Sequence, residues 1–595
     1  MILQALNDYY RRKCDDPDPA QRLPMFGLEQ KEIPFILEIN ADGELLQMRD
    51  TREISGKKKV AHTFRVPMGI KKTSGVAANL LWDTLEYVLG INTKGKPERV
   101  AEQHAAFRAR IAALPDAARG DAGIQAVTRF LDCIDLAMLQ RQPAWAEALE
   151  SNAIVSFRLH GDMDLVCQRP AVVSASLKAA AGDDAPLAMC LVTGELAPVE
   201  RLHTSIKGVW KAQTSGANIV SFNARAFESY GKTDRQGENA PVSRAAAFAY
   251  TTALNHLLRK DSPQRIQVGD ASTVFWAERD SDFETAAVDI FGEPPKDDPD
   301  RGTRAVHALL NAVHSGAWGT SDVSTRFYVL GLAPNAARIS VRFYHCVTLG
   351  ELGQRIAQHF EDLSLMRGPH DPQYPSLFRL LTAVSLQNKA DNIPPNLGGT
   401  IMDSIIAGVN SPYPSLWLNA AVGRCRAEQN VNYLRAAAIK ACLNRQMRHA
   451  QLSSSNPSLE QEFSPMLDIS NLNPAYRLGR LFAVLEKIQE EASPGLNATI
   501  RDRYYGAASS TPVAVFTTLL RLKNAHLKKL TAGRVTTFEK LLGEVLGPVT
   551  DFPKHLPLAD QGRFALGYYH QRQDFFAKKS DESITTTASK EGTPA

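Results

Sequence analysis

The strand-like spacing of apolar residues recurs along the first part of this chain and fades near Cys346, and this change limits the folds that are available to it. Before Cys346, "IPFILEINADGELLQMRD" (33–50) predicts two strands joined by an Asp42-Gly43 turn. Helical segments such as "ERVAEQHAAFRARIAAL" (98–114) lie between such strands. After Cys346 the strand pattern fades and helical spacing dominates. We therefore predict an α+β protein, in which a mixed N-terminal domain with antiparallel strands and helices is followed by a mostly helical region.

The end of the chain has the clearest helix boundaries. Asn473-Pro474 and Thr511-Pro512 are typical helix starts, and Thr536 with Glu539 has capping-box spacing before a third helix. A fourth helix covers "DQGRFALGYYHQRQDFFAKK" (560–579). Short connections between the four helices predict a four-helix bundle.

The domain boundaries follow from these patterns. We predict an α+β domain over 1–345, a helical connecting region over 346–465, and the helical bundle over 466–595, with a disordered tail from about residue 580. The segment near 278–301 is acidic and contains three prolines, which favours an exposed, mobile insertion.

The overall composition excludes several classes of protein. The net charge is only +4 over 595 residues, so any nucleic-acid role depends on local basic patches. The seven cysteines include no C-x-x-C pair, which argues against a zinc ribbon and a disulfide framework and favours a reducing cytoplasm. No apolar stretch has the length of a membrane helix. We expect no cofactor and no metal.

The segment "GIKKTSGVAANLLWD" (69–83) looks like a phosphate-binding loop but lacks the nucleotide-binding pattern. In that pattern a lysine follows the second glycine and reaches the terminal phosphates. Here Val76 follows Gly75, and the lysines Lys71 and Lys72 come before it. The loop is therefore not predicted to bind ATP.

A second segment, "IKGVWKAQTSGANIVSFN" (206–223), repeats this arrangement of lysines before T-S-G. Small hydroxyl and glycine residues let backbone N–H groups approach a phosphate, and lysine neutralises its charge. An asparagine shortly after each T-S-G can donate to and accept from base edges. The candidate DNA-binding residues are Lys71, Lys72, Thr73, Ser74, Gly75, Asn79, Lys207, Lys211, Thr214, Ser215 and Asn218.

Three further runs of basic residues are candidates for contacts with a nucleic-acid backbone or a displaced DNA strand. A single charged run is usually a solvated face, but several runs in one chain favour a surface that follows phosphates. The candidates are Lys57, Lys58, Lys59, Arg424, Arg426, Arg435, Lys440, Arg445, Arg448, Lys523, Lys528 and Lys529.

Two other functions stay open from the residues alone. Asp162 and Asp164 in "HGDMDLV" are paired carboxylates of the kind that hold Mg²⁺, so a metal-dependent nuclease is one alternative, although we favour a polar turn between strands as the explanation for them. The second alternative is a purely structural subunit whose basic faces bind RNA or partner proteins.

Several long segments carry a resemblance to a known family. They include "KKTSGVAANLLWDTLEYVLGI", "CLVTGELAPVERLHTSIKGVWKAQTSGANIVSFNARAFESYGK", "QGENAPVSRAAAFAYTTALNHLL", "NAARISVRFYH" and "QGRFALGYYHQRQDFF". With these segments the chain resembles the large subunit of the type I-C CRISPR Cascade, the Dvulg subtype of the Cas-eight superfamily. The segments are spread over nearly the whole chain, and the acidic segment near 278–301 is not among them.

The resemblance implies a role in crRNA-guided DNA surveillance. Such subunits recognise the protospacer-adjacent motif on duplex DNA, promote R-loop formation and hold the non-target strand, while guide pairing supplies most of the sequence specificity. They are not themselves the enzyme that cuts DNA. The implied partners are crRNA, double-stranded target DNA, the backbone and crRNA-processing subunits, a separate small subunit, and a recruited helicase–nuclease.

The resemblance also implies a second product from the same gene. The helical C-terminus is similar to the small subunit of related Cascades, which in this subtype can be made from an internal start. Met466 lies just before the first helix of the predicted bundle, and we interpret it as a candidate for that start.

Overall fold

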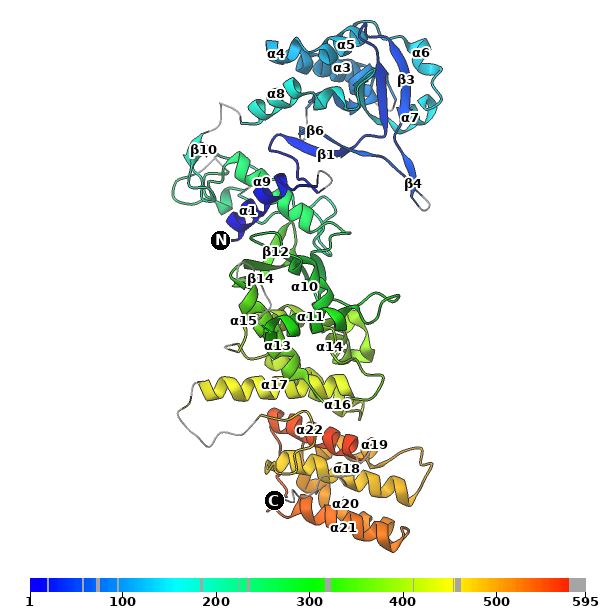
Figure 1. The fold of residues 1–595 in the computed structure, drawn as a ribbon, viewed down its shortest axis with the longest axis vertical. Helices are drawn as coiled ribbons and strands as arrows, with labels where there is room; N and C mark the ends of the chain where they lie inside the picture. Colours follow the sequence, from blue (N-terminus) through cyan, green and yellow to red (C-terminus); the bar gives the residue numbers. More distant parts are fainter. Residues whose placement is uncertain are drawn as a thin grey trace, which may run out of the picture. The chain divides into compact units, whose positions relative to one another are not determined.

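The chain forms two compact units, residues 1–206 with 218–256, and residues 207–217 with 257–595. This division differs from the predicted boundaries at 345 and 465. The structure is a computed structural model, drawn in Figure 1. It describes residues 1–18, 21–55, 58–70, 75–93, 96–181, 186–222, 224–232, 236–315, 323–409, 411–452, 454 and 462–576.

The first unit contains a four-stranded sheet in the order β3-β2-β8-β7. β2 pairs antiparallel with β3 and parallel with β8, so the predicted hairpin over 33–50 is confirmed. The helices and strands of this unit, including the four of the sheet, are α1 (Ile2–Cys14), β1 (Leu28–Glu32), β2 (Phe35–Ile39), β3 (Leu45–Asp50), β4 (Glu53–Ser55), β5 (Lys58–Val60), β6 (Thr63–Pro67), β7 (Trp82–Thr84), α2 (Leu85–Leu89), α3 (Pro97–Ala112), α4 (Asp116–Arg119), α5 (Ala122–Asp132), α6 (Leu136–Gln140), α7 (Trp145–Ser151), β8 (Ile154–Leu159), α8 (Pro170–Ala181), β9 (Leu187–Met189), β10 (Leu196–Pro198) and α9 (Arg244–Leu257).

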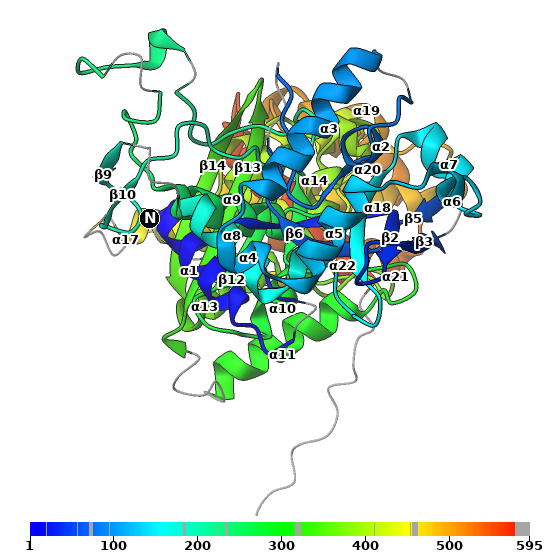
Figure 2. The same cartoon turned by 90° about the horizontal axis from the view of Figure 1, so that it is seen from above.

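Helices cover this sheet and protect its edge. Phe157 of β8 contacts Phe107 of α3 and Phe130 of α5, with ring centroids 6.5 and 5.7 Å apart, so the aromatic core joins the sheet to both helices. α6 and α7 lie beside β3 (Figures 1 and 2). There the backbone N–H of Met48 donates to Gln142 Oε1, which satisfies a group that an edge strand would otherwise expose.

The second unit begins with an antiparallel sheet in the order β11-β12-β13-β14 and continues as helices. The predicted α+β fold class is therefore confirmed. The elements are β11 (Arg265–Val268), β12 (Ala271–Ala277), α10 (Phe283–Phe291), α11 (Arg301–Ser315), β13 (Arg326–Asn335), β14 (Arg338–Thr348), α13 (Leu349–Leu363), α14 (Leu377–Ala383), α15 (Leu397–Ala407), α16 (Ser415–Ala427), α17 (Tyr433–Leu452), α18 (Pro474–Ala492), α19 (Ile500–Ala508), α20 (Phe516–Leu527), α21 (Ala532–Leu546) and α22 (Leu558–Asp574).

The acidic segment near 278–301 differs from the exposed insertion that its composition suggested. Its first half forms α10, in which Phe291 is buried and stacks on Phe275 of β12 with ring centroids 6.2 Å apart. Phe283 packs edge-on against Phe327 of β13. The apolar residues between the acidic ones thus hold α10 on the sheet, and the exposed parts of the segment are 278–280 and most of 293–300.

The four predicted C-terminal helices are α18, α20, α21 and α22, and α19 comes between the first two in chain order. The predicted start of α18 is confirmed, because Asn473 Oδ1 accepts from the backbone N–H groups of Ala475 and Tyr476. The capping box at Thr536 is wrong. α21 begins at Ala532, and the Thr536 hydroxyl donates to the Ala532 carbonyl inside the helix.

The C-terminal helices share one hydrophobic core with the rest of the second unit. α22 carries this continuity, because Gly562 brings it against Ile439 of α17, and the Tyr569 hydroxyl donates to the Met366 carbonyl. On its other side, glycines at 479 and 567 let α18 and α22 pack backbone to backbone.

Candidate nucleic-acid interface

The first T-S-G loop is attached to a rigid base, although Lys71, Lys72, Thr73 and Ser74 lie outside the described residues. The base is closed by two hydrogen bonds across the loop: Trp82 Nε1 donates to the Pro67 carbonyl at 2.9 Å, and the Ile70 N–H donates to Asn79 Oδ1 at 3.0 Å. Gly75 is exposed, with open space where a Cβ would stand.

The structure corrects the prediction that Asn79 contacts DNA bases. Its side chain is 5% exposed, its Oδ1 holds the Ile70 amide, and its own N–H donates to Asp83 Oδ2 at 3.0 Å. An amide that is buried and already bonded to the backbone cannot read a base edge. Asn79 instead fixes the two ends of the loop next to each other.

The basic run before this loop is partly neutralised. Lys57 and the side chain of Lys58 lie outside the described residues. Lys59 Nζ lies 3.0 Å from Glu147 Oε2, and Arg52 binds the same carboxylate. These cations hold the pKa of Glu147 below its usual range, so the carboxylate stays ionised and competes with any phosphate for Lys59.

The second T-S-G loop is exposed and firmly anchored. Lys207, Lys211, Thr214 and Ser215 are all exposed on residues 207–217 of the second unit. The anchor is Gly208, where a Cβ would lie 2.4 Å from the Leu258 carbonyl oxygen and where φ is +87°, a combination that only glycine satisfies.

Asn218 belongs to the first unit and lines a small polar cavity of about 160 Å³ there, with Arg201 and Gln236. Its Nδ2 donates to the His203 carbonyl at 2.9 Å. The side chain is half-buried, so part of its hydrogen-bonding capacity is already used.

The arginines and lysine of α17 are a second correction. Arg435, Lys440 and Arg445 are 1%, 2% and 0% exposed, so these cations are not available to a nucleic-acid backbone. The reason is that α17 is surrounded by other helices. Sequence spacing alone made the same residues look like a solvated basic stripe.

Each buried cation has protein partners instead. Arg445 Nε donates to Asp362 Oδ2 at 2.9 Å and its Nη2 donates to the Tyr413 hydroxyl at 3.0 Å. Lys440 Nζ donates to the Asp362 carbonyl at the end of α13, and burial lowers its pKa to about 8. Arg435 binds the Ala383 carbonyl and Glu428.

Some of the remaining basic candidates are paired with protein groups, and others are exposed. Arg448 bridges Asp362 and Glu462, Arg426 donates to Gln561 Oε1 at 3.2 Å, and Arg424 lies 3.7 Å from Glu428. In α20, Lys523 pairs with Glu539 at 3.1 Å. The other two candidates in this run, Lys528 and Lys529, follow α20 and are exposed.

The two carboxylates weighed for a nuclease have different surroundings in the structure. Asp162 binds Arg169, while Asp164 is exposed. Among the residues that the structure describes, no group of three or more His, Cys, Asp or Glu side chains has the arrangement of a metal site. The described helices also include none that is long and apolar enough to cross a membrane.

The sequence of the chain matches a known protein family over most of its length. The model of the CRISPR-associated protein family Cas_Csd1 matches residues 6–576. The chain belongs to this family. A search of curated proteins finds no match. The Csd1 match confirms the resemblance at the level of a CRISPR-associated large subunit, and the type I-C assignment stays a prediction.

Sequence reasoning missed one residue of the Csd1 chain's second loop, Trp210. Its side chain is 40% exposed between two lysines of the loop. The signal was present, because an aromatic residue among basic ones is typical of surfaces that bind single strands. The prediction for this loop rested on the lysine, hydroxyl and glycine residues that favour phosphate, and these residue types do not point to an aromatic ring.

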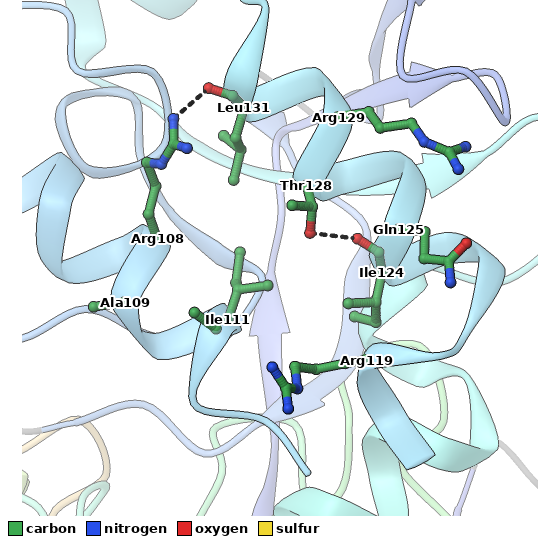
Figure 3. Close-up of a pocket in the computed structure, with 10 residues that line it drawn as sticks. Arg108, Ala109, Ile111, Arg119, Ile124, Gln125, Thr128, Arg129 and Leu131 are labelled. Carbon is green, nitrogen blue, oxygen red and sulfur yellow. Dashed lines mark hydrogen bonds between the residues drawn. The ribbon is translucent and has the colours of Figure 1, made fainter. Parts of the chain in front are cut away.

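The Csd1 chain also has a hollow between α3 and α5 of about 520 Å³, shown in Figure 3. Ile111, Ile124 and Leu131 form its apolar lining. Its arginines are engaged: Arg108 donates to the Leu131 carbonyl and pairs with Asp132, and Arg119 pairs with Asp116. This hollow is therefore a weaker candidate for phosphate than the exposed loop at 207–217.

Proposed function

We propose that this Csd1-family chain is the large subunit of a type I-C crRNA-guided surveillance complex. In this role it recognises the protospacer-adjacent motif on duplex DNA, promotes R-loop formation, holds the non-target strand and helps to recruit a helicase–nuclease. Its partners are crRNA, target DNA and the other Cascade subunits, and the chain itself does not cut DNA. The family match supports the CRISPR assignment.

The observation that carries the DNA-binding part of the proposal is the exposed, anchored loop at 207–217. A loop whose backbone is fixed loses little conformational freedom on binding, so its lysines and hydroxyls are pre-organised for phosphates. Lys71 and Lys72 have the same sequence context in the first loop. Guide pairing supplies sequence specificity, so the protein needs only a short motif and backbone contacts.

The salt dependence of duplex binding tests these lysines. Replacing Lys207 and Lys211 with alanine is expected to weaken binding and to reduce the slope of log K against log salt by about 0.9 for each lost phosphate contact. Lys71→Ala with Lys72→Ala tests the first loop in the same way. Binding is measured by fluorescence anisotropy at several salt concentrations.

The matched control is Lys296→Ala, which removes an exposed cation from the acidic segment and is expected to leave the slope unchanged. An unchanged slope in the Lys207 and Lys211 variant contradicts a phosphate contact by the second loop. Relaxed motif preference in Asn218→Ala indicates base readout, whereas uniform weakening indicates a positioning role.

We also propose that Met466 is an internal start that yields the C-terminal helices as a small subunit. Met466 is 59% exposed in the segment before α18, and α18 to α22 follow it directly. A product that begins there lacks α16 and α17 and exposes the face of α22 around Gly562. That face then becomes available to a partner subunit.

Met466→Leu, encoded by the non-initiating codon CUC, is expected to abolish the short product while the full-length chain accumulates and unfolds normally, because the side chain is exposed. Immunoblotting of a C-terminally tagged gene measures both products. Met447→Leu is the control that changes a methionine outside the proposed start. Persistence of the short product in Met466→Leu rules out initiation at this codon.

A further inference from the structure

We propose that Trp210 is a stacking platform for an unpaired nucleobase, with Lys211 binding the phosphate next to that base. The inference rests on the proposed nucleic-acid role and deepens it, because it assigns to the loop a preference for single strands that lysines alone do not give. Bases of an opened duplex present their faces, and an exposed aromatic ring is the protein surface that fits them.

The structure holds Trp210 at the surface by fixing the backbone on which it stands. Its N–H donates to Ser272 Oγ at 3.0 Å, and Ser272 is fully buried in β12 and donates in turn to Gln267 Oε1. Val209, the preceding residue, is buried, and Gly208 contacts the Leu258 backbone. These contacts fix the backbone at Trp210, so the indole ring stays exposed at the surface.

The adjacent lysine is placed over the ring. Lys211 Nζ lies 4.1 Å from the centroid of the Trp210 ring. Lys211 has φ +60°, a left-handed conformation that non-glycine residues rarely adopt and that costs energy to maintain. A cation–π contact at an exposed site is weak compared with base stacking, so a base can displace the ammonium group, which then binds the neighbouring phosphate.

The residues near the ring in the sequence favour a nucleic acid as the ligand. An acidic protein segment would use the positive charge of this loop but would not need the aromatic face. The sequence from Arg201 to Phe227 contains no aspartate or glutamate, and it supplies Lys207 and Lys211 together with the exposed hydroxyls of Thr214 and Ser215. Cations, hydroxyls and one aromatic face within a single loop match the phosphate and base of one nucleotide.

The test uses the full chain and a single-stranded oligothymidine, with affinity measured by fluorescence anisotropy at low salt. Trp210→Ala is expected to weaken binding about 5- to 150-fold, which is the usual range for loss of one stacked base. Trp210→Phe retains an aromatic face and is expected to restore most of the affinity. The salt slope stays at the wild-type value in both variants, because no charge is lost, whereas Lys211→Ala lowers it.

One further measurement and one control variant distinguish stacking on Trp210 from binding that does not depend on this ring. Quenching of 2-aminopurine in the strand reports stacking directly and is expected to disappear in Trp210→Ala. Phe378→Ala removes a ring of similar exposure, 41%, on α14 and is expected to change neither signal. Wild-type affinity and quenching in Trp210→Ala overturn the platform while leaving the proposed function intact. A wild-type chain that binds neither single strands nor duplex overturns the proposed function and this inference together.

Discussion

Gly479→Ala is expected to destabilise the second unit by about 3 kcal/mol, and this is among the largest effects of any small substitution in the chain. A Cβ at 479 would lie 2.0 Å from the Phe564 carbonyl oxygen and 2.8 Å from the Tyr568 nitrogen, both of which are backbone atoms of α22. Neither atom can rotate away as a side chain can. The two helices must separate along their common core.

The opposite position gives an independent check. A Cβ at Gly567 of α22 would lie 2.0 Å from the Tyr476 carbonyl oxygen of α18, so Gly567→Ala is expected to have an effect of the same size. Urea unfolding followed by circular dichroism measures both variants. The matched control is Gly543→Ala in α21, where no atom lies within 4 Å, and which is expected to stabilise by about 0.5–1 kcal/mol. Equal stabilities for Gly479→Ala and Gly543→Ala contradict the close contact.

Asp362→Ala is expected to destabilise the second unit by about 3–5 kcal/mol, because it leaves a buried guanidinium without its counter-charge. Asp362 is 1% exposed and Arg445 is 0% exposed, and Arg448 binds the other carboxylate oxygen at 2.9 Å. The same cluster includes His359, whose hydrogen bond to Tyr413 is 2.6 Å long and whose pKa is lowered to about 3 by burial and by Arg445.

Two variants, each compared with Asp362→Ala, separate this network from ordinary surface pairing. Asp116→Ala removes the exposed partner of Arg119 and is expected to change stability by less than about 1 kcal/mol. Asp362→Leu combined with Arg445→Met is expected to cost less than Asp362→Ala alone, since no charge stays unpaired. Thermal and urea unfolding measure all three. A double variant that is less stable than Asp362→Ala contradicts the assignment of the cost to the unpaired arginine.

Local sequence rules predicted the features that depend on neighbours in the chain. The strand pair at 33–50 and the Asn473 cap of α18 both depend on residues a few positions apart. The capping box at Thr536 failed because Ala532 already continued the helix upstream. Local patterns therefore gave the element types more accurately than the boundaries.

The candidate site was predicted only in part, because exposure is not a local property. Lys207, Lys211, Thr214 and Ser215 are exposed as expected, while Asn79 is used to close its own loop. The acidic composition near 278–301 predicted an exposed insertion, although phenylalanines in this segment attach α10 to the sheet.

The sequence by itself determined the α+β class, the helical C-terminus, two lysine-rich T-S-G loops and the family. These properties depend on residue order alone. Only the tertiary structure decided the role of each cation. Arg445 and Lys440 lie far along the chain from Asp362 and the end of α13, and packing buries both side chains beside these partners. In contrast, contacts of Gly208 and Ser272 fix the backbone at Trp210, whose side chain stays exposed to solvent. The physical reason is that a charge or a ring has the same letter in the sequence whether the fold buries it beside a partner or leaves it exposed for a ligand.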